Sequence, residues 1–296
     1  MPGPVVRIVI GCAYCLLSVG LFVLNGLVLS AILRHKEFRT TTYRIIKVMI
    51  VGCMMQLCSH IAGGVMTITS TVPFHVEKIF GAWLTSGWFL AQGASMALAV
   101  DRALIFVTRS GATISTVSFW VLTIFSVAIA LLYLVIFLTP GFGFAYNSCL
   151  DWNYNPDSES MAMLTLEMVL DFFISSANLI IYVVIFICLI RMRCGGGTTF
   201  ASCTVEIKIL LIAVVSFIYE CAYLFCFFWG STHIASHTLA SILIMILWIL
   251  DCGIFAVSTL VINSSLRRKV YAPIVRSENK VTTVSRQPVA RVNGRK

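Results

Sequence analysis

Charged residues are scarce in this chain, at 11% of its 296 residues, whereas hydrophobic residues make up 59%. A soluble domain carries about 25% charged residues. The composition therefore excludes a soluble globular protein and favours one whose surroundings are the apolar interior of a bilayer. The eleven cysteines fall nearly all inside apolar stretches. There cysteine behaves as a small hydrophobic residue, and the paired spacing of a zinc site is missing.

Motifs of common enzymes and nucleotide sites are also missing. The sequence has no H-E-x-x-H, no G-x-S-x-G and no P-loop. The basic residues behind the net charge of +9 lie in short gaps between apolar runs and in the C-terminal tail, not among stacking aromatics. We therefore predict no enzymatic activity, no cofactor, no metal site and no nucleic-acid partner.

Long apolar runs make up most of the chain. A helix that crosses a bilayer needs about 20 predominantly apolar residues. Seven runs meet this requirement: 8–33, 43–70, 79–107, 114–138, 161–190, 209–229 and 239–262. Each is roughly two to three times the length of a barrel strand, and a helix satisfies its own backbone groups in lipid. We predict an all-α membrane protein, a bundle of seven transmembrane helices. The last run has no lysine, which excludes a retinal Schiff base there.

Lysine and arginine are distributed unevenly between the two sides of such a bundle. Of the 21, 19 lie in or beside the first, third and fifth gaps and in the tail. Positive charge collects on the cytoplasmic side of membrane proteins. We therefore expect the N-terminus outside and the C-terminus in the cytoplasm. The uncharged run 8–33 is too long for the apolar region of a signal peptide, so we interpret it as a spanning helix.

Three carboxyl side chains lie deep inside apolar runs, namely Asp171, Glu220 and Asp251, and Glu167 precedes Asp171 by one helical turn. A charge at the centre of a bilayer costs roughly 2.5–3.5 kcal/mol on insertion scales, so each is a functional candidate. One interpretation is a polar pocket, or a cation or proton site, between the fifth, sixth and seventh helices. The other is that they are protonated or water-bridged groups that hold helices together.

Asp101-Arg102 lies at the inner end of the third helix. It is either an ordinary interfacial flank, with Arg102 reaching toward the lipid headgroups, or a charged latch that changes partner when the bundle opens. Glu206 and Lys208, at the inner start of the sixth helix, are possible partners of such a latch.

Four stretches carry a resemblance to a known family. They are Thr42-Tyr43-Arg44-Ile45-Ile46 with Gln56, His60 and Gly63-Gly64 after it, Lys78-Ile79-Phe80-Gly81-Ala82 before Trp88, Ala97-Leu98-Ala99-Val100-Asp101-Arg102, and the segment from Leu247-Trp248 to Leu266-Arg267. In order and spacing they resemble the nematode serpentine chemoreceptors of class T, with class X as the neighbour, within the G-protein-coupled receptors.

The resemblance implies a plasma-membrane receptor for small environmental molecules that signals to a heterotrimeric G protein. Arg102 would be the helix 3 arginine that faces the G protein, with Asp101, Glu206 and Lys208 beside it. A short helix would follow at 263–274 along the inner membrane surface, so that the receptor domain covers 1–274 and a disordered basic cytoplasmic tail covers 275–296.

The ligand site is expected in the outer half of the bundle, between the third, fifth, sixth and seventh helices. Its expected residues are Trp88, Gln92, Asp171, Glu220 and Tyr223. The sequence departs from the wider receptor pattern in several respects: alanine follows Arg102, the last helix has Phe255-Ala256 and Thr259 in place of asparagine-proline and tyrosine, and a disulfide is missing. Cys149 follows the fourth helix, but the third helix does not start with a cysteine, so the disulfide usual between those elements cannot form.

Two other functions fit the same pattern. The first is a seven-helix channel or a proton or ion transporter that uses Asp171, Glu220 and Asp251. The second is a non-signalling relative of the receptors. The charged pair at the inner membrane face favours a signalling receptor, because a transporter has no need of it there.

Overall fold

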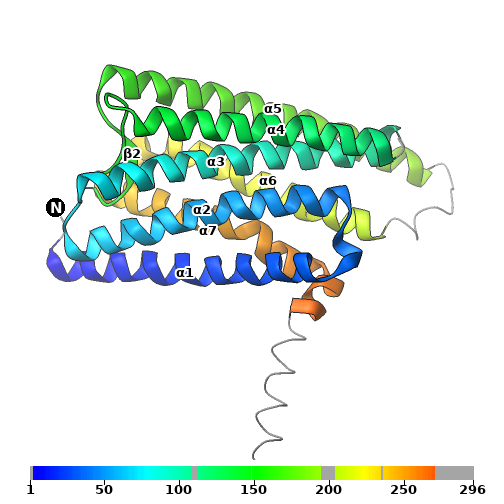
Figure 1. The fold of residues 1–296 in the computed structure, drawn as a ribbon, viewed down its shortest axis with the longest axis horizontal. Helices are drawn as coiled ribbons and strands as arrows, with labels where there is room; N and C mark the ends of the chain where they lie inside the picture. Colours follow the sequence, from blue (N-terminus) through cyan, green and yellow to red (C-terminus); the bar gives the residue numbers. More distant parts are fainter. Residues whose placement is uncertain (1–2, 109–111, 148, 195–203, 235, 271–296) are drawn as a thin grey trace, which may run out of the picture.

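The computed structural model describes residues 3–108, 112–147, 149–194, 204–234 and 236–270. Seven helices in this part of the chain are long and apolar enough to cross a membrane, which confirms the predicted all-α membrane fold. They run side by side in one elongated bundle (Figure 1). Their bounds are Pro4–Arg34 (α1), Thr41–Thr69 (α2), Phe74–Ala103 (α3), Ala112–Leu138 (α4), Ser158–Cys194 (α5), Thr204–Phe228 (α6) and His237–Ile262 (α7).

Several helices begin before their apolar runs do. Proline at the first helical position is compatible with a helix start, and α1 begins at Pro4. Pro73 is the N-cap of α3, which therefore includes Glu77 and Lys78 in its first turns. Short turns join the ends: η1 at Lys36–Phe38, a π-type turn η2 at Leu104–Thr108 and η4 at Gly230–His233.

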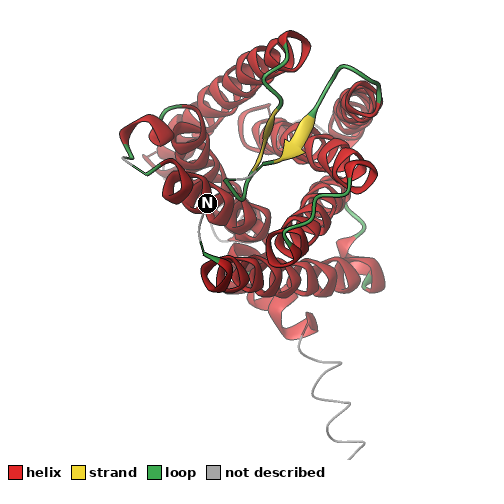
Figure 2. Cartoon of the chain, turned by 90° about the vertical axis from the view of Figure 1, so that its left-hand side faces the viewer, coloured by secondary structure: helices red, strands yellow, loops and turns green. Residues whose placement is uncertain are grey.

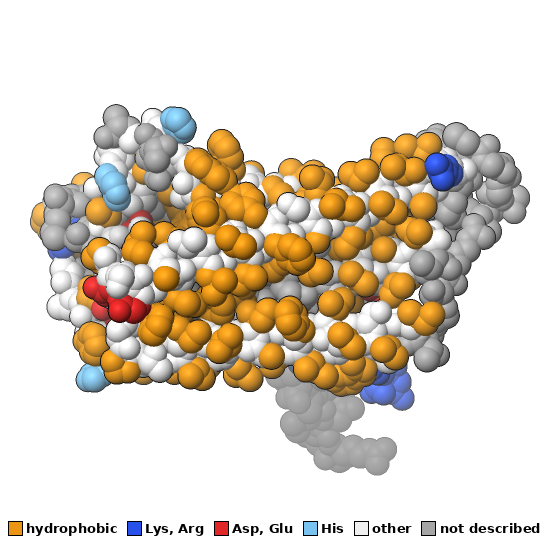
Figure 3. Space-filling view, turned by 90° about the horizontal axis from the view of Figure 1, so that it is seen from above, with side chains coloured by type: hydrophobic (Ala, Val, Ile, Leu, Met, Phe, Trp, Pro, Cys, Tyr) orange, Lys and Arg blue, Asp and Glu red, His pale blue; other side chains and the backbone are white. Residues whose placement is uncertain are grey.

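The outward faces of the helices are apolar. In an apolar stretch of 18 residues from each helix, only 17% of the residues are buried in α5 and 22% in α4. In α2, α3 and α7 half of the residues or more are buried. Hydrophobic side chains cover the length of the bundle, while acidic and histidine side chains gather at its left-hand end (Figure 3). Helix α3 lies at the centre of the bundle, because it contacts α2, α4, α5 and α6. The apolar outer surface of the bundle requires lipid around it.

The segment between α4 and α5 contains a β-hairpin that the sequence analysis does not anticipate. Strands Phe144–Tyr146 (β1) and Trp152–Tyr154 (β2) pair antiparallel, with Phe144 opposite Tyr154 and Tyr146 opposite Trp152. All four aromatic side chains are buried. Figure 2 shows the strands lying across the end of the bundle, inside the ring of helices. We call this the hairpin end.

Two glycines let the hairpin approach the helices. A Cβ atom on Gly81 of α3 would lie 2.0 Å from the backbone oxygen of Phe144. A Cβ atom on Gly63 of α2 would lie 2.9 Å from both Tyr146 and Trp152 ring atoms. Polar contacts add to this packing, since Glu77 Oε1 accepts a hydrogen bond of 2.6 Å from the Tyr146 backbone N–H. The hairpin is thus part of the core at this end.

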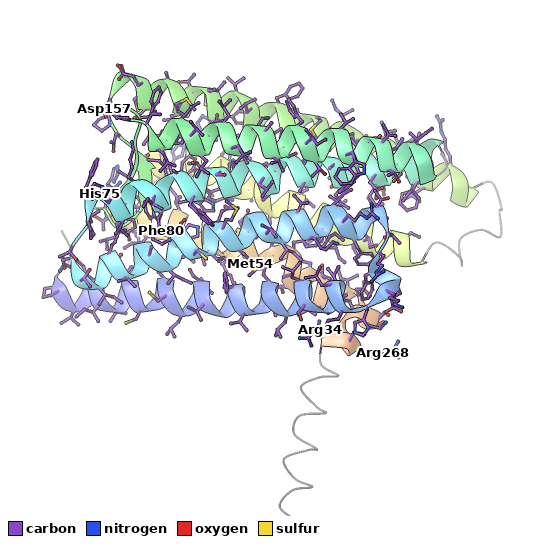
Figure 4. All side chains as sticks on the ribbon, in the orientation of Figure 1. Arg34, Met54, His75, Phe80, Asp157 and Arg268 are labelled. Carbon is purple, nitrogen blue, oxygen red and sulfur yellow. The ribbon has the colours of Figure 1, made fainter. Side chains whose placement is uncertain are left out.

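The other end of the bundle carries a further short helix at residues 264–270. Asn263 caps it, because its side-chain oxygen accepts a hydrogen bond of 3.2 Å from the Leu266 N–H. Leu266 and Val270 are buried against the core. Lys269 forms an ion pair with Glu37 and lies 5.2 Å from the ring centroid of Phe38. Figure 4 shows Arg34 and Arg268 at this end and His75 and Asp157 at the hairpin end. The predicted tail, 275–296, lies outside the described residues.

Candidate functional site

An aromatic cluster fills the bundle just beneath the hairpin. The ring centroids of Trp88 on α3, Tyr223 on α6 and Trp248 on α7 lie 5.6 to 6.0 Å apart. Phe144 of the hairpin contacts Trp248 from above, with 6.1 Å between centroids. Aromatic pairs at this spacing in tilted or edge-to-face arrangement are favourable beyond their buried area. The cluster joins three helices and the hairpin.

Two carboxyl groups of α5 are hydrogen-bonded to this aromatic region. The Trp88 indole Nε1 donates to Asp171 Oδ1 across 3.1 Å. One turn nearer the hairpin end, the Tyr154 hydroxyl donates to Glu167 Oε2. Burial raises the pKa of Tyr154 well above its ordinary value, so the hydroxyl keeps its proton and acts as a donor. Both carboxyl side chains are buried. They are held in place by donors that the sequence analysis did not identify.

A small cavity lies between α2, α3, α6 and α7, on the other side of the aromatic cluster from the hairpin. Its volume is about 40 Å³, and Trp88, Gln92, Glu220 and Asp251 are among the residues that line it. Glu220 lies beside Gln92. A buried water needs roughly 10–15 Å³ on this measure. The cavity therefore has room for a few water molecules, and a ligand of any size would have to displace side chains.

The five residues expected to bind ligand thus divide into two groups. Trp88, Gln92 and Glu220 line the cavity. Asp171 and Tyr223 do not line it, but both contact Trp88. All five side chains are buried. Trp88 is the residue that connects the two groups.

Helix α2 also contributes to this region, which the sequence analysis did not expect. Gln56 Oε1 accepts a hydrogen bond of 2.9 Å from the Trp248 Nε1. The His60 ring lies 5.3 Å from that of Trp248 and is fully buried. Neither ring nitrogen of His60 has a hydrogen-bond partner among the described residues. Gln56 and His60 both belong to a stretch that carries the family resemblance. That stretch is the sequence feature that points to them as residues of the site.

Asp101 and Arg102 form a closed cluster at the opposite end of α3. Arg102 Nη2 lies 2.5 Å from Asp101 Oδ2 and also donates to the Thr42 hydroxyl. Thr42 and Ser115 each donate to the Asp101 carboxylate across 2.7 Å. Arg102 is fully buried, so the interpretation that it reaches toward lipid headgroups is wrong. The arginine is held inward because two neighbouring helices, α2 and α4, supply hydroxyl groups to its carboxylate partner.

The two partners expected on α6 are Glu206 and Lys208. Lys208 is half-buried at the start of that helix. The Glu206 side chain lies outside the described residues. Within the described part of the chain, no group of three histidine, cysteine or carboxyl side chains is arranged to hold a metal ion. Cys149 carries a free thiol there.

The comparisons with known proteins agree with this architecture. A family model described as serpentine type 7TM GPCR chemoreceptor Srt matches residues 3–283, nearly the whole chain. Among solved structures, the fold is similar to that in the crystal structure of squid rhodopsin, with a TM-score of 0.71 over 98% of this chain and 94% of that chain. The identity of 12% limits this second likeness to the fold. No curated protein matches the sequence significantly. The chain is a multi-pass membrane protein that belongs to the Srt family of serpentine seven-transmembrane G-protein-coupled chemoreceptors.

Proposed function

We propose that this protein is a chemosensory receptor of the plasma membrane, which binds a small environmental molecule beneath the hairpin and signals to a heterotrimeric G protein. The hairpin end faces outside in this proposal, because 19 of the 21 lysines and arginines belong to the sequence gaps and the tail that are expected on the cytoplasmic side. Family membership supports a receptor. The place of the ligand site beneath the hairpin and the coupling to a G protein are what we propose beyond family membership.

The observation that carries the ligand site is the meeting of Asp171, Glu220 and Trp88 beneath an aromatic hairpin. Carboxyl groups buried in a membrane bundle cost free energy, and for this reason they commonly mark functional sites. Glu220 Oε1 and the amide oxygen and nitrogen of the Gln92 side chain are buried, and among the described residues none is well aligned for a hydrogen bond to them. A ligand with a hydrogen-bonding group would satisfy them. Because the cavity is only about 40 Å³, side chains around it would have to move for such a ligand to enter.

The signalling part of the proposal rests on the Asp101–Arg102 cluster. Arg102 is enclosed by Asp101 and Thr42, so its guanidinium faces the protein and not the cytoplasm. A G protein would need this arginine released. Ligand binding would act through α3, which carries Trp88 and Gln92 at one level and Arg102 further along the same helix. Glu206 and Lys208 complete the proposed coupling surface at the start of α6.

A second-messenger assay in cells that express the chain tests the coupling. Wild type is compared with Arg102→Ala across a panel of small volatile and water-soluble compounds, at equal surface level. A ligand-dependent signal that Arg102→Ala loses, and that Arg191→Ala on the exposed end of α5 keeps, supports the proposal. The absence of a signal from either protein, when both are present at the cell surface, contradicts the proposal. An ion flux altered by Asp251→Asn would then favour the transporter.

The ligand site has its own test in the same assay. Glu220→Gln keeps the shape of the side chain but removes its charge, and we expect it to lose the response at normal surface expression. Glu159→Gln is the matched control, because Glu159 is exposed at the hairpin end. An unchanged response in variants of all five residues, Trp88, Gln92, Asp171, Glu220 and Tyr223, would rule out this site.

A further inference from the structure

A second cavity opens at the hairpin end, between the hairpin, the end of α6 and the start of α7. Its volume is about 210 Å³, roughly five times that of the inner cavity, and the two share no lining residue. Asp151 and Asn153 of the hairpin form one side, and Phe227, Phe228 and Ile244 are among the residues of the other. This outer cavity has room for a molecule the size of one substituted aromatic ring.

Asp151 is the charged group of the outer cavity. The residue lies in the hairpin turn and is only 7% exposed. Its backbone oxygen accepts a hydrogen bond of 2.9 Å from the Asn147 N–H, which fixes the turn. The side chains of Ser241 and Asn147 lie within reach of a hydrogen bond to the carboxyl group, and His237 is near enough to stabilise its charge. Even so, Oδ1 has no hydrogen-bond partner of good geometry among the described residues.

The surroundings of Asp151 select the charge of a ligand. Among the described residues that line the cavity, His237 is the only one with a basic side chain, and no lysine or arginine faces the carboxylate. An anion would be repelled, and a purely apolar molecule would leave the carboxylate oxygen without a partner. The phenyl rings of Phe227 and Phe228 offer apolar surface and a face for a cation.

We propose that the outer cavity binds a small organic amine, with the ammonium group on Asp151 and the carbon skeleton against Phe227 and Phe228. The assignment uses none of the five residues of the inner site. It rests on the proposed function only in that the hairpin end is taken to face outside.

Phe227 connects the outer cavity to the inner aromatic cluster. Its ring centroid lies 5.9 Å from that of Tyr223 and 6.1 Å from that of Trp248. Phe227 also contacts Phe228, at 5.1 Å. An amine in the outer cavity would therefore contact the ring that touches two members of the inner aromatic cluster, Tyr223 and Trp248. The amine either binds in the outer cavity on its way to the inner site or uses the outer cavity as a separate binding site. Both roles require the contact with Asp151.

The test measures binding directly on the purified full chain in lipid nanodiscs, through the rise in unfolding temperature with ligand concentration. The probes are benzylamine, which is protonated at neutral pH, and benzyl alcohol, its neutral analogue of nearly the same shape. We expect benzylamine to stabilise wild type, with benzyl alcohol at least tenfold weaker. Asp151→Asn should reduce the apparent affinity for benzylamine tenfold or more and leave that for benzyl alcohol unchanged.

Two matched variants separate this site from its alternatives. Asp157→Asn removes an exposed charge at the same end and should bind benzylamine like wild type. Glu220→Gln removes the inner carboxylate and should also bind it like wild type. Equal stabilisation by both probes, full binding by Asp151→Asn, no binding by wild type, or loss of binding in Glu220→Gln alone would each overturn the assignment. The last result would place the amine in the inner site and leave the proposed receptor function intact.

Discussion

The Trp248 indole nitrogen donates a hydrogen bond of 2.9 Å to the side-chain oxygen of Gln56, and so ties α7 to α2 at the level of the aromatic cluster. The Cys252 thiol, one turn along α7, lies 3.6 Å from the same oxygen. Both donors are buried. Trp248 is also the residue that Phe144 of the hairpin and Tyr223 contact.

Gln56→Leu should destabilise the bundle because it leaves the buried Trp248 N–H without its acceptor. The expected loss is about 1 kcal/mol, since hydrogen bonds between membrane helices contribute modestly. Thermal unfolding of the purified chain measures it. Combining Gln56→Leu with Trp248→Phe should cost less than the sum of the two single changes. Additivity within about 0.5 kcal/mol would show that the two side chains do not interact.

Asp101→Asn should raise signalling in the absence of ligand, because the neutral amide holds Arg102 less tightly than the carboxylate does. A hydrogen bond to a charged group contributes about 1.5–3 kcal/mol, so the active population could rise by about tenfold or more. The second-messenger level without ligand is the measurement. Ser115→Ala removes only one hydroxyl from the same carboxylate and should have a smaller effect. Equal basal signals in wild type and Asp101→Asn would argue against a latch.

Asp151 should make the stability of the chain depend on pH. Burial raises the pKa of its carboxyl group above the ordinary value of 3.8. The folded state therefore binds this proton more tightly than the unfolded state, and the group costs stability at pH values above its folded pKa. Protonation removes the cost as the pH falls. The Asp151→Asn variant should unfold at a higher temperature than wild type at pH 7, and the difference should shrink as the pH is lowered toward 4. A difference that grows on acidification would contradict the sign of the shift.

The sequence predicts the seven helices well and their lateral contacts poorly. Runs such as 114–138 are long and apolar because lipid surrounds them, and that requirement acts on each helix separately. Which polar groups meet depends on how each helix is rotated about its axis. The hydrogen bond from Trp248 to Gln56 joins residues 192 positions apart and leaves no local pattern.

The burial of Arg102 and the hairpin illustrate the same difficulty at the two ends of the bundle. From the sequence, an arginine at a helix end is expected to reach toward the lipid headgroups. Helix packing changes this, because it brings Thr42 and Ser115 beside Asp101, the partner of Arg102. Strands of three residues are too short for a reliable alternation pattern, although the aromatic–small–aromatic order of Phe144 to Tyr146 was a signal. The carboxyl groups were found because any charge in an apolar run stands out, but their donors were not.

Gly81→Ala should displace the hairpin, because the added methyl group would lie 2.0 Å from the Phe144 backbone oxygen. Backbone cannot give way as the tip of a side chain can, so the strand has to move away from α3. Forced overpacking costs about 1–3 kcal/mol. Gly20→Ala on the lipid-facing surface of α1 is the matched control, since a Cβ atom there meets nothing within 4 Å and alanine favours a helix. We expect a lower unfolding temperature and faster proteolysis within the segment 140–157 for Gly81→Ala, and neither for Gly20→Ala. Wild-type protection of that segment in Gly81→Ala would mean that the hairpin does not rest on α3 as described.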